Sequence, residues 1–236
     1  MRVEPFAVNS YMHALKRGAR GLPITKSLSE KRRFMRLLFY MNDHYSSDDA
    51  WERETRTMGM FGRPEDWPKR RPLVKIVAWT LMPNHFHLLL KETEKGGISK
   101  FMQKLGNSMS TYANLKHKEK GSLFQGSYKG RTVKSDAYLR YLASYIMVKN
   151  VFELYPGGLQ KAALEFGNAW QWAIKAYPFS SLADYALGRA SPIVEKDILG
   201  ELFDSPAHFR SCSRDILEGR GHTVREDDAL KGLLID

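Results

Sequence analysis

Two kinds of apolar periodicity run along the chain, and together they predict strands mixed with helices. The apolar stretch 73–90 contains the Pro83-Asn84 turn signal, which predicts a β-hairpin with a second strand over His85–Leu90. Residues 6–15 and 121–133 also have strand-like or ribbon-like content. Apolar residues at helical spacing predict helices over 29–41, 98–118, 136–150, 159–172 and within 193–217.

Between these elements lie polar stretches without a clear period. Residues 42–71 contain Gly59, Gly62, Pro64 and Pro68, which predicts a loop or a partly helical excursion, functional or mobile. Residues 220–236 are polar, and we expect them to be disordered. Pro156-Gly157-Gly158 marks a break. It predicts two parts, a domain over 1–155 and a helical C-terminal extension over 156–236.

Composition narrows the class of protein. Of the 236 residues, 43% are hydrophobic and 27% charged, which is typical of a globular protein. There is no run of about 18 apolar residues that would span a membrane, and the first residues lack the apolar core of a signal peptide. The single cysteine, Cys212, excludes an internal disulfide framework and a Cys-rich zinc site. We therefore expect a cytoplasmic location.

The net charge of +11 is concentrated in the first part of the chain. Residues 1–150 hold 28 Lys/Arg against 13 Asp/Glu, whereas residues 151–236 hold 9 against 13. Such concentration favours a polyanion partner, most often nucleic acid, because cations that neutralise phosphates release counterions. A solvated basic surface is the alternative. The candidate phosphate-binding residues are Lys16, Arg17, Arg20, Lys104, Lys129, Arg131, Lys134 and Lys149.

His85 and His87 form the first candidate functional site, a metal site. In a strand they project from one face, about 6–7 Å apart, while Phe86, Leu88 and Leu90 point to the other. Two imidazoles placed in this way can converge on one divalent metal. The alternative is a pair of half-buried histidines satisfied by hydrogen bonds.

The predicted helix 136–150 is the second candidate. Tyr138, Tyr141 and Tyr145 lie beside its apolar stripe. Tyrosines at such a boundary bury the ring and leave the hydroxyl in contact with solvent. A structural role for these tyrosines is therefore the alternative to a catalytic one.

The order of these features resembles a known family. Met82-Pro83-Asn84-His85-Phe86-His87-Leu88-Leu89-Leu90 is followed by a helix, then by Gly121-x-Leu123-Phe124-Gln125-Gly126-x-Tyr128-Lys129. Next come Tyr138-Leu139-x-x-Leu142-x-x-Tyr145-Ile146 and Tyr177-Pro178-Phe179-Ser180-Ser181-x-x-x-Tyr185. Over roughly residues 6–190 the chain resembles the REP-associated tyrosine transposases, a branch of the single-tyrosine HUH nucleases.

The resemblance implies an α+β fold, with a ferredoxin-like antiparallel sheet flanked by helices and a mainly helical C-terminal extension. It also implies an enzyme that cuts and rejoins single-stranded DNA at or near hairpins with Mg²⁺ or Mn²⁺, and a possible homodimer. Carried over by position, His85 and His87 would bind the metal, and Tyr145 would be the nucleophile that forms a 5′-phosphotyrosine.

The third metal ligand departs from the family pattern. The family places a polar residue four positions after the tyrosine, but here that position is Lys149, and Asn150 follows it. In a regular α-helix of about 100° per residue, Asn150 points away from Tyr145. A helix end or a π-bulge would turn Asn150 toward the side of Tyr145. Asn150 is therefore the candidate ligand, with water or Glu153 as alternatives.

Two other functions remain open from the sequence. One is a domesticated protein, weakly active or inactive, that binds nucleic-acid hairpins. The other is an unrelated zinc hydrolase that uses His85 and His87. Only the transposase hypothesis predicts a metal-dependent covalent adduct between the protein and DNA.

Overall fold

The computed structural model describes residues 7–47, 50–133 and 135–219. Its centre is a four-stranded sheet in the order β2-β3-β1-β4, formed by β1 (Tyr11–Arg17), β2 (Val74–Leu81), β3 (His85–Glu92) and β4 (Lys129–Val133). All three strand pairs are antiparallel. With a helix after β1 and another after β3, this is the predicted ferredoxin-like arrangement.

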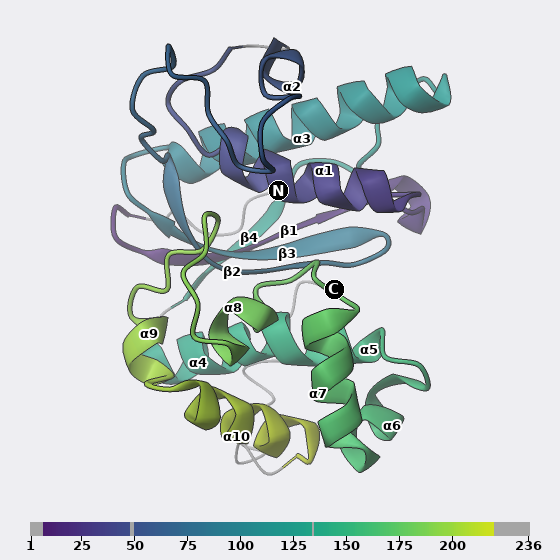
Figure 1. The fold of residues 1–236 in the computed structure, drawn as a ribbon, viewed down its shortest axis with the longest axis vertical. Helices are drawn as coiled ribbons and strands as arrows, with labels where there is room; N and C mark the ends of the chain where they lie inside the picture. Colours follow the sequence, from purple (N-terminus) through teal and green to yellow (C-terminus); the bar gives the residue numbers. More distant parts are fainter. Residues whose placement is uncertain (1–6, 48–49, 134, 220–236) are drawn as a thin grey trace.

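Helices cover both faces of the sheet (Figure 1). The long helices α1 (Leu28–Tyr40) and α3 (Gly97–His117) lie on one face, and Ser27 caps α1 by accepting a hydrogen bond from the Glu30 amide. The other face carries the helices that follow β4, and those after residue 156 confirm the mainly helical extension. The helices on this face are α4 (Asp136–Ser144), α5 (Asn150–Glu153), α6 (Gly158–Leu164), α7 (Phe166–Lys175), α8 (Leu182–Ala186), α9 (Leu199–Leu202) and α10 (Pro206–Leu217).

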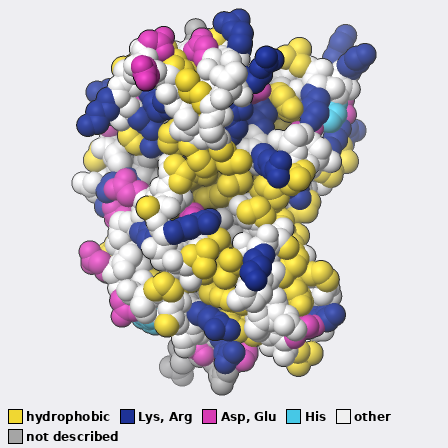
Figure 2. Space-filling model, in the orientation of Figure 1, with side chains coloured by type: hydrophobic (Ala, Val, Ile, Leu, Met, Phe, Trp, Pro, Cys, Tyr) yellow, Lys and Arg dark blue, Asp and Glu magenta, His cyan; other side chains and the backbone are white. Residues whose placement is uncertain are grey.

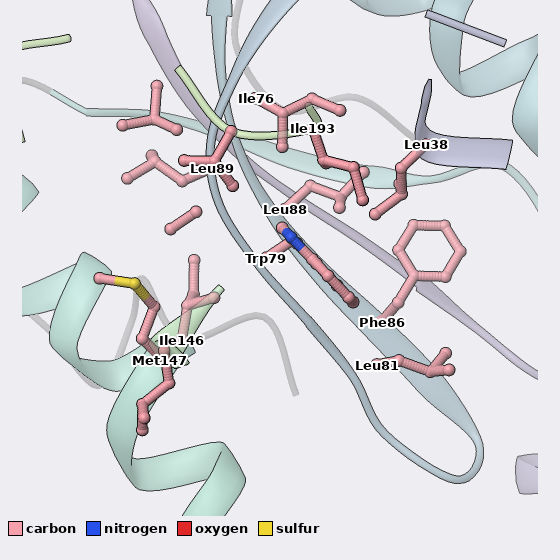
Figure 3. Packing of buried hydrophobic residues seen from close by; sticks show 14 of the residues in the cluster. Leu38, Ile76, Trp79, Leu81, Phe86, Leu88, Leu89, Ile146, Met147 and Ile193 are labelled. Atoms are coloured by element: carbon pink, nitrogen blue, oxygen red, sulfur yellow. The ribbon is translucent and has the colours of Figure 1, made fainter. Parts of the chain in front are cut away.

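Strand alternation places apolar side chains against both helical layers. The ring of Phe86 on β3 lies 5.2 Å from that of Phe34 on α1. Figure 3 shows Leu38 beside Phe86 on one side of the β2–β3 hairpin, and Ile146 and Met147 on the helix at the other. The sheet is therefore buried on both faces, which explains why β2 and β3 are almost continuously apolar.

The edge strand β2 is covered by the segment that follows α7. The Leu81 amide donates to the Phe179 carbonyl at 3.0 Å, and the Ser181 amide donates to the Trp79 carbonyl at 2.9 Å. The Tyr185 hydroxyl reaches the Val77 carbonyl at 2.8 Å. An uncovered edge would expose unpaired backbone groups, so the aromatic segment 177–185 has a structural role here.

Several predicted boundaries were wrong. The first strand begins at Tyr11 and includes Lys16 and Arg17, so the basic loop starts only at Gly18. Within the predicted ribbon 121–133 only β4 is a strand, because the segment before it makes a single bridge, Gly18 to Phe124. The predicted helix 159–172 is two helices, interrupted at Glu165, whose ψ of 48° is not helical.

Other regions follow the sequence pattern more closely. The excursion 42–71 contains the short helix α2 (Trp51–Glu54), as the partly helical alternative allowed. The segment 220–236, expected to be disordered, lies outside the described residues. The division into two domains at residue 155 stays a prediction. No helix in the described part of the chain is long and apolar enough to cross a membrane.

Candidate active site

The two histidines of β3 share one face of the sheet, as strand alternation predicts. Their ring centroids are 4.8 Å apart. The His87 ring lies 5.7 Å from the ring of Tyr145, edge to face, on the side opposite to Phe86. His87 is fully buried and His85 half-buried. The strand thus presents two imidazoles toward the predicted nucleophile.

A third histidine, His13 on β1, lies beside His87 and was not predicted from the sequence. It is fully buried, and its Nε2 lies 2.8 Å from Nδ1 of His87. The two rings stack with centroids 5.1 Å apart. Nothing in the sequence near residue 13 indicates this pairing, because it depends on the register of β1 against β3.

The environment of His87 keeps its imidazole neutral. Burial, followed by the nearby His13 and His85, holds the pKa of His87 well below its usual range. Its Nε2 is buried and has no hydrogen-bond partner among the described residues. A neutral imidazole with one nitrogen hydrogen-bonded and the other unpaired is the form that binds a metal ion.

The turn before β3 orients His85. Nδ1 of His85 lies 2.7 Å from Oδ1 of Asn84. The Asn84 side-chain amide in turn donates to the Gly21 carbonyl at 3.1 Å. The Pro83-Asn84 turn therefore fixes the ring of His85 as well as the hairpin.

The helix that carries Tyr145 contains a π-helical segment, η3 (Tyr145–Lys149), between α4 and α5. The Asn150 amide donates to the Tyr145 carbonyl, five residues back. The Thr80 hydroxyl on β2 donates to the Ile146 carbonyl and ties η3 to the sheet. This wider turn is a π-bulge, one of the two ways predicted to turn Asn150 toward the same side of the helix as Tyr145.

As a result, Tyr145 and Asn150 line the same small cavity. It has a volume of about 120 Å³, and its other lining residues are Leu15, Arg17, His85 and Glu153. Tyr145 and Asn150 are 4% and 1% exposed. The candidate nucleophile and one candidate metal ligand on β3 thus lie at the same cavity as Asn150 and Glu153, the two residues considered for the third ligand.

The other two tyrosines of this helix do not line that cavity. Burial raises the pKa of Tyr138 to about 12, although the nearby Arg131 opposes the shift. Tyr145 does line the cavity, and the Lys149 ammonium lies 5.4 Å from the centre of its ring.

The donor atoms at this place fit a divalent ion only in part. Among the described residues there is no group of three or more His, Cys, Asp or Glu side chains arranged to hold a metal. However, Nε2 of His87 and Nδ2 of Asn150 are buried without hydrogen-bond partners in this part of the chain. The side-chain amide of Asn150 can be turned to present its oxygen. Two imidazoles and one amide oxygen could therefore hold a metal.

The predicted DNA-binding cations do not form one patch. Arg17 lines the Tyr145 cavity, and Lys149 stands over the Tyr145 ring. Lys16 points to the α3 face, where burial lowers its pKa and its ammonium lies 4.8 Å from the Phe124 ring centre. Lys104 donates to the Asp43 carbonyl at 2.7 Å and so holds a loop.

The remaining candidates are spread over the surface. Lys129 is exposed and Arg131 half-buried on β4, and Arg20 is exposed in the loop after β1. Lys134 lies outside the described residues. Figure 2 shows Lys and Arg side chains scattered over one face of the molecule, with hydrophobic side chains gathered in the hollow between its two halves.

Comparison with known proteins bears on the same elements. Residues 69–149, which contain both histidines and Tyr145, match a family model. That model describes the IS200-like transposases. The match confirms the resemblance predicted from the sequence and covers the segment from before β2 to the end of η3.

Two further comparisons add less. No curated protein matches the chain. Among solved structures, the chain is similar to a REP-associated tyrosine transposase bound to a REP hairpin, with 14% sequence identity and a TM-score of 0.46. That alignment covers 84% of this chain and 92% of the other.

Proposed function

We propose that the protein is a metal-dependent transposase or nickase that cleaves and rejoins single-stranded DNA at or near hairpins. The observation that carries the proposal is the π-helical turn at Tyr145–Lys149, which places Asn150 and Tyr145 at one cavity with His85. π-Bulges are frequent at functional sites. The transposase family match over residues 69–149 supports the same reaction class.

In this proposal His85, His87 and Asn150 hold a divalent ion, with water or Glu153 as the alternative to Asn150. Bound there, Mg²⁺ or Mn²⁺ would polarise a phosphate oxygen and stabilise the leaving oxygen. Imidazole ligands suit Mn²⁺, whereas Mg²⁺ prefers oxygen. His13 contacts Nδ1 of His87, which would leave Nε2 of His87 for the metal.

Tyr145 is the proposed nucleophile. Its phenolic oxygen attacks the phosphorus, the bond to the 3′-oxygen breaks, and the phenolic proton leaves as the 3′-oxygen gains one. Tyrosine is a poor nucleophile at neutral pH, so we assign to Lys149 the role of favouring the phenolate. The products are a 5′-phosphotyrosine and a free 3′-hydroxyl, and rejoining requires no ATP because the covalent link retains the energy of the broken bond.

A binding-only protein is the second candidate. It is favoured by the incomplete cluster of strong metal ligands in the described part of the chain. Such a protein would recognise hairpins through its basic residues and form no covalent intermediate.

One experiment separates the two candidates. The protein is incubated with a labelled library of single-stranded DNA hairpins and Mn²⁺ or Mg²⁺, and the products are run on a denaturing gel and mapped by peptide sequencing. A metal-dependent adduct on Tyr145 supports the transposase and identifies its substrate. Tight binding without an adduct would support the binding-only protein.

A further inference from the structure

A second cavity lies on the other side of the sheet from Tyr145. It has a volume of about 350 Å³ and is formed by the loop 19–26, by α1 and by the C-terminal half of α3. This is within the range of roughly 300–1,000 Å³ that small-ligand pockets occupy. Buried apolar side chains line its interior, among them Ile24, Phe34 and Met109.

One residue that lines this cavity has a buried hydroxyl without a hydrogen-bond partner in the described part of the chain. Thr25 is 7% exposed, and its Oγ1 has no hydrogen-bond partner among the described residues. A buried hydroxyl without a hydrogen bond is costly. A ligand with a polar edge and apolar faces would satisfy it.

The mouth of the cavity carries uncompensated positive charge. Its two acids are already paired, Glu30 with Lys116 at 2.9 Å and Glu119 with Lys26 at 2.6 Å. Arg20 and Lys120 are also lining residues, both exposed, and neither is paired with any other described residue. The cations that remain available at the mouth therefore favour an anionic group there.

The loop that forms one wall is joined to the candidate active site. The Gly18 amide donates to the Asn84 carbonyl at 2.7 Å, and the Ile24 amide donates to the Pro83 carbonyl at 2.9 Å. Asn84 also contacts Nδ1 of His85 through its side chain. A ligand in the cavity would thus be held at a fixed position relative to His85.

We propose that this cavity binds one unpaired nucleotide of the DNA strand. The base lies against the apolar interior with its polar edge on the Thr25 hydroxyl, and the phosphate lies at Arg20 and Lys120. Nucleobases combine an apolar face with a hydrogen-bonding edge, and unpaired bases are the ones that proteins can take into such pockets. This inference rests on the proposed function and gives it a means of placing the strand relative to the metal site.

The test uses the hairpin that the wild-type protein selects from a random-flank library, and a set of copies that each lack one base in the unpaired flanks. Affinities are measured by fluorescence anisotropy at one salt concentration. We expect loss of one particular base to weaken wild-type binding about tenfold, as removing one stacked base does elsewhere. Loss of the other bases should have little effect.

Two variants address the cavity directly. Ala113→Phe fills it from α3, and Thr25→Val removes the unpaired hydroxyl at nearly constant shape. Both should weaken binding of the intact hairpin and reduce the difference between it and the copy that lacks the critical base. Leu115→Phe, at a position of α3 that is 76% exposed, is the matched control and should behave like the wild type.

The outcomes separate this inference from the proposed function. The cavity does not hold a base if the hairpin binds but loss of no single base weakens binding. The same conclusion follows if Ala113→Phe and Thr25→Val distinguish the intact hairpin from the copy that lacks the critical base as fully as the wild type does. Either result overturns only this inference. If no hairpin is selected, both proposals are overturned.

Discussion

Nε2 of His13 lies 2.8 Å from Nδ1 of His87, and both side chains are fully buried between the sheet and the C-terminal helices. Two neutral imidazoles can share only one proton in such a contact. If Nε2 of His87 binds a metal, its Nδ1 must carry the proton and donate it to His13. The contact therefore accommodates the tautomer that metal binding requires, with His13 as the acceptor.

Replacing His13 should weaken both the metal site and the fold. In His13→Phe the ring is kept, but Nδ1 of His87 is left buried without a partner, which should lower the free energy of unfolding by about 1–3 kcal/mol. Loss of an orienting partner typically lowers metal affinity about 10- to 100-fold. Mn²⁺ titration followed by electron paramagnetic resonance, together with urea unfolding, measures both effects. An unchanged Mn²⁺ affinity would show that His13 does not orient His87.

The hairpin and the two long helices could be predicted from the sequence because each carries a strong local signal. The Pro83-Asn84 turn and the apolar run set β2 and β3, and a stripe at helical spacing sets α3. The break at Glu165 was not predictable from periodicity, because apolar residues continue across it. The cover over β2 required knowing which strand lies at the edge of the sheet.

Part of the candidate site could also be predicted from the sequence. Alternation alone places His85 and His87 on one face. His13 is 74 residues away from His87, and only the strand register brings the two together. The π-helical turn was an open alternative, because its stability depends on contacts such as that of Thr80 with Ile146, which are tertiary.

Removing the phenolic oxygen of Tyr145 should separate cleavage from binding. Tyr145→Phe keeps the ring beside His87, so hairpin affinity should change by less than about twofold, whereas the covalent adduct should disappear. Tyr141→Phe, on the same helix but outside the cavity, is the control and should form the adduct normally. A denaturing gel checks both variants, and an adduct in Tyr145→Phe would assign the nucleophile to another residue.

Asp197 joins the C-terminal segment to the sheet through a network of charges. It accepts hydrogen bonds from Lys75 at 2.8 Å and Lys91 at 2.9 Å, and from the Tyr11 hydroxyl. Burial alone would raise the pKa of Asp197, but these bonds outweigh it and hold the pKa well below its usual range. The ionised carboxylate therefore stabilises the folded state.

The stabilisation by Asp197 should depend on pH in a defined direction. Because its pKa is lower in the folded than in the unfolded protein, the contribution is full above the unfolded value of about 3.9 and is lost as the pH falls toward the folded value. Asp197→Asn keeps the shape and tolerates the positive φ of 48° at this position. We expect this variant to be less stable at pH 7 by about 1–3 kcal/mol.

Urea unfolding of both proteins across the acidic range measures that difference. The gap between wild type and Asp197→Asn should narrow steadily below about pH 4. A gap that is constant with pH would show that the carboxylate charge is not the source of the stability.

Asn150 should show opposite effects on stability and on metal binding. Its Nδ2 is buried without a partner among the described residues. Asn150→Leu removes an unsatisfied polar group and should leave the free energy of unfolding unchanged or raise it by about 1 kcal/mol. If the amide oxygen is a metal ligand, the same change should lower Mn²⁺ affinity at least tenfold, by analogy with the loss of outer ligands.

Asn150→Asp is the matched control, because it keeps the shape and supplies a carboxylate oxygen, which divalent cations bind more strongly than an amide. It should bind Mn²⁺ as tightly as the wild type or more tightly. Isothermal titration with Mn²⁺ compares the three proteins. Equal affinity in Asn150→Leu and the wild type would exclude Asn150 as a ligand and leave water or Glu153 as the third donor, since Glu153 lines the same cavity.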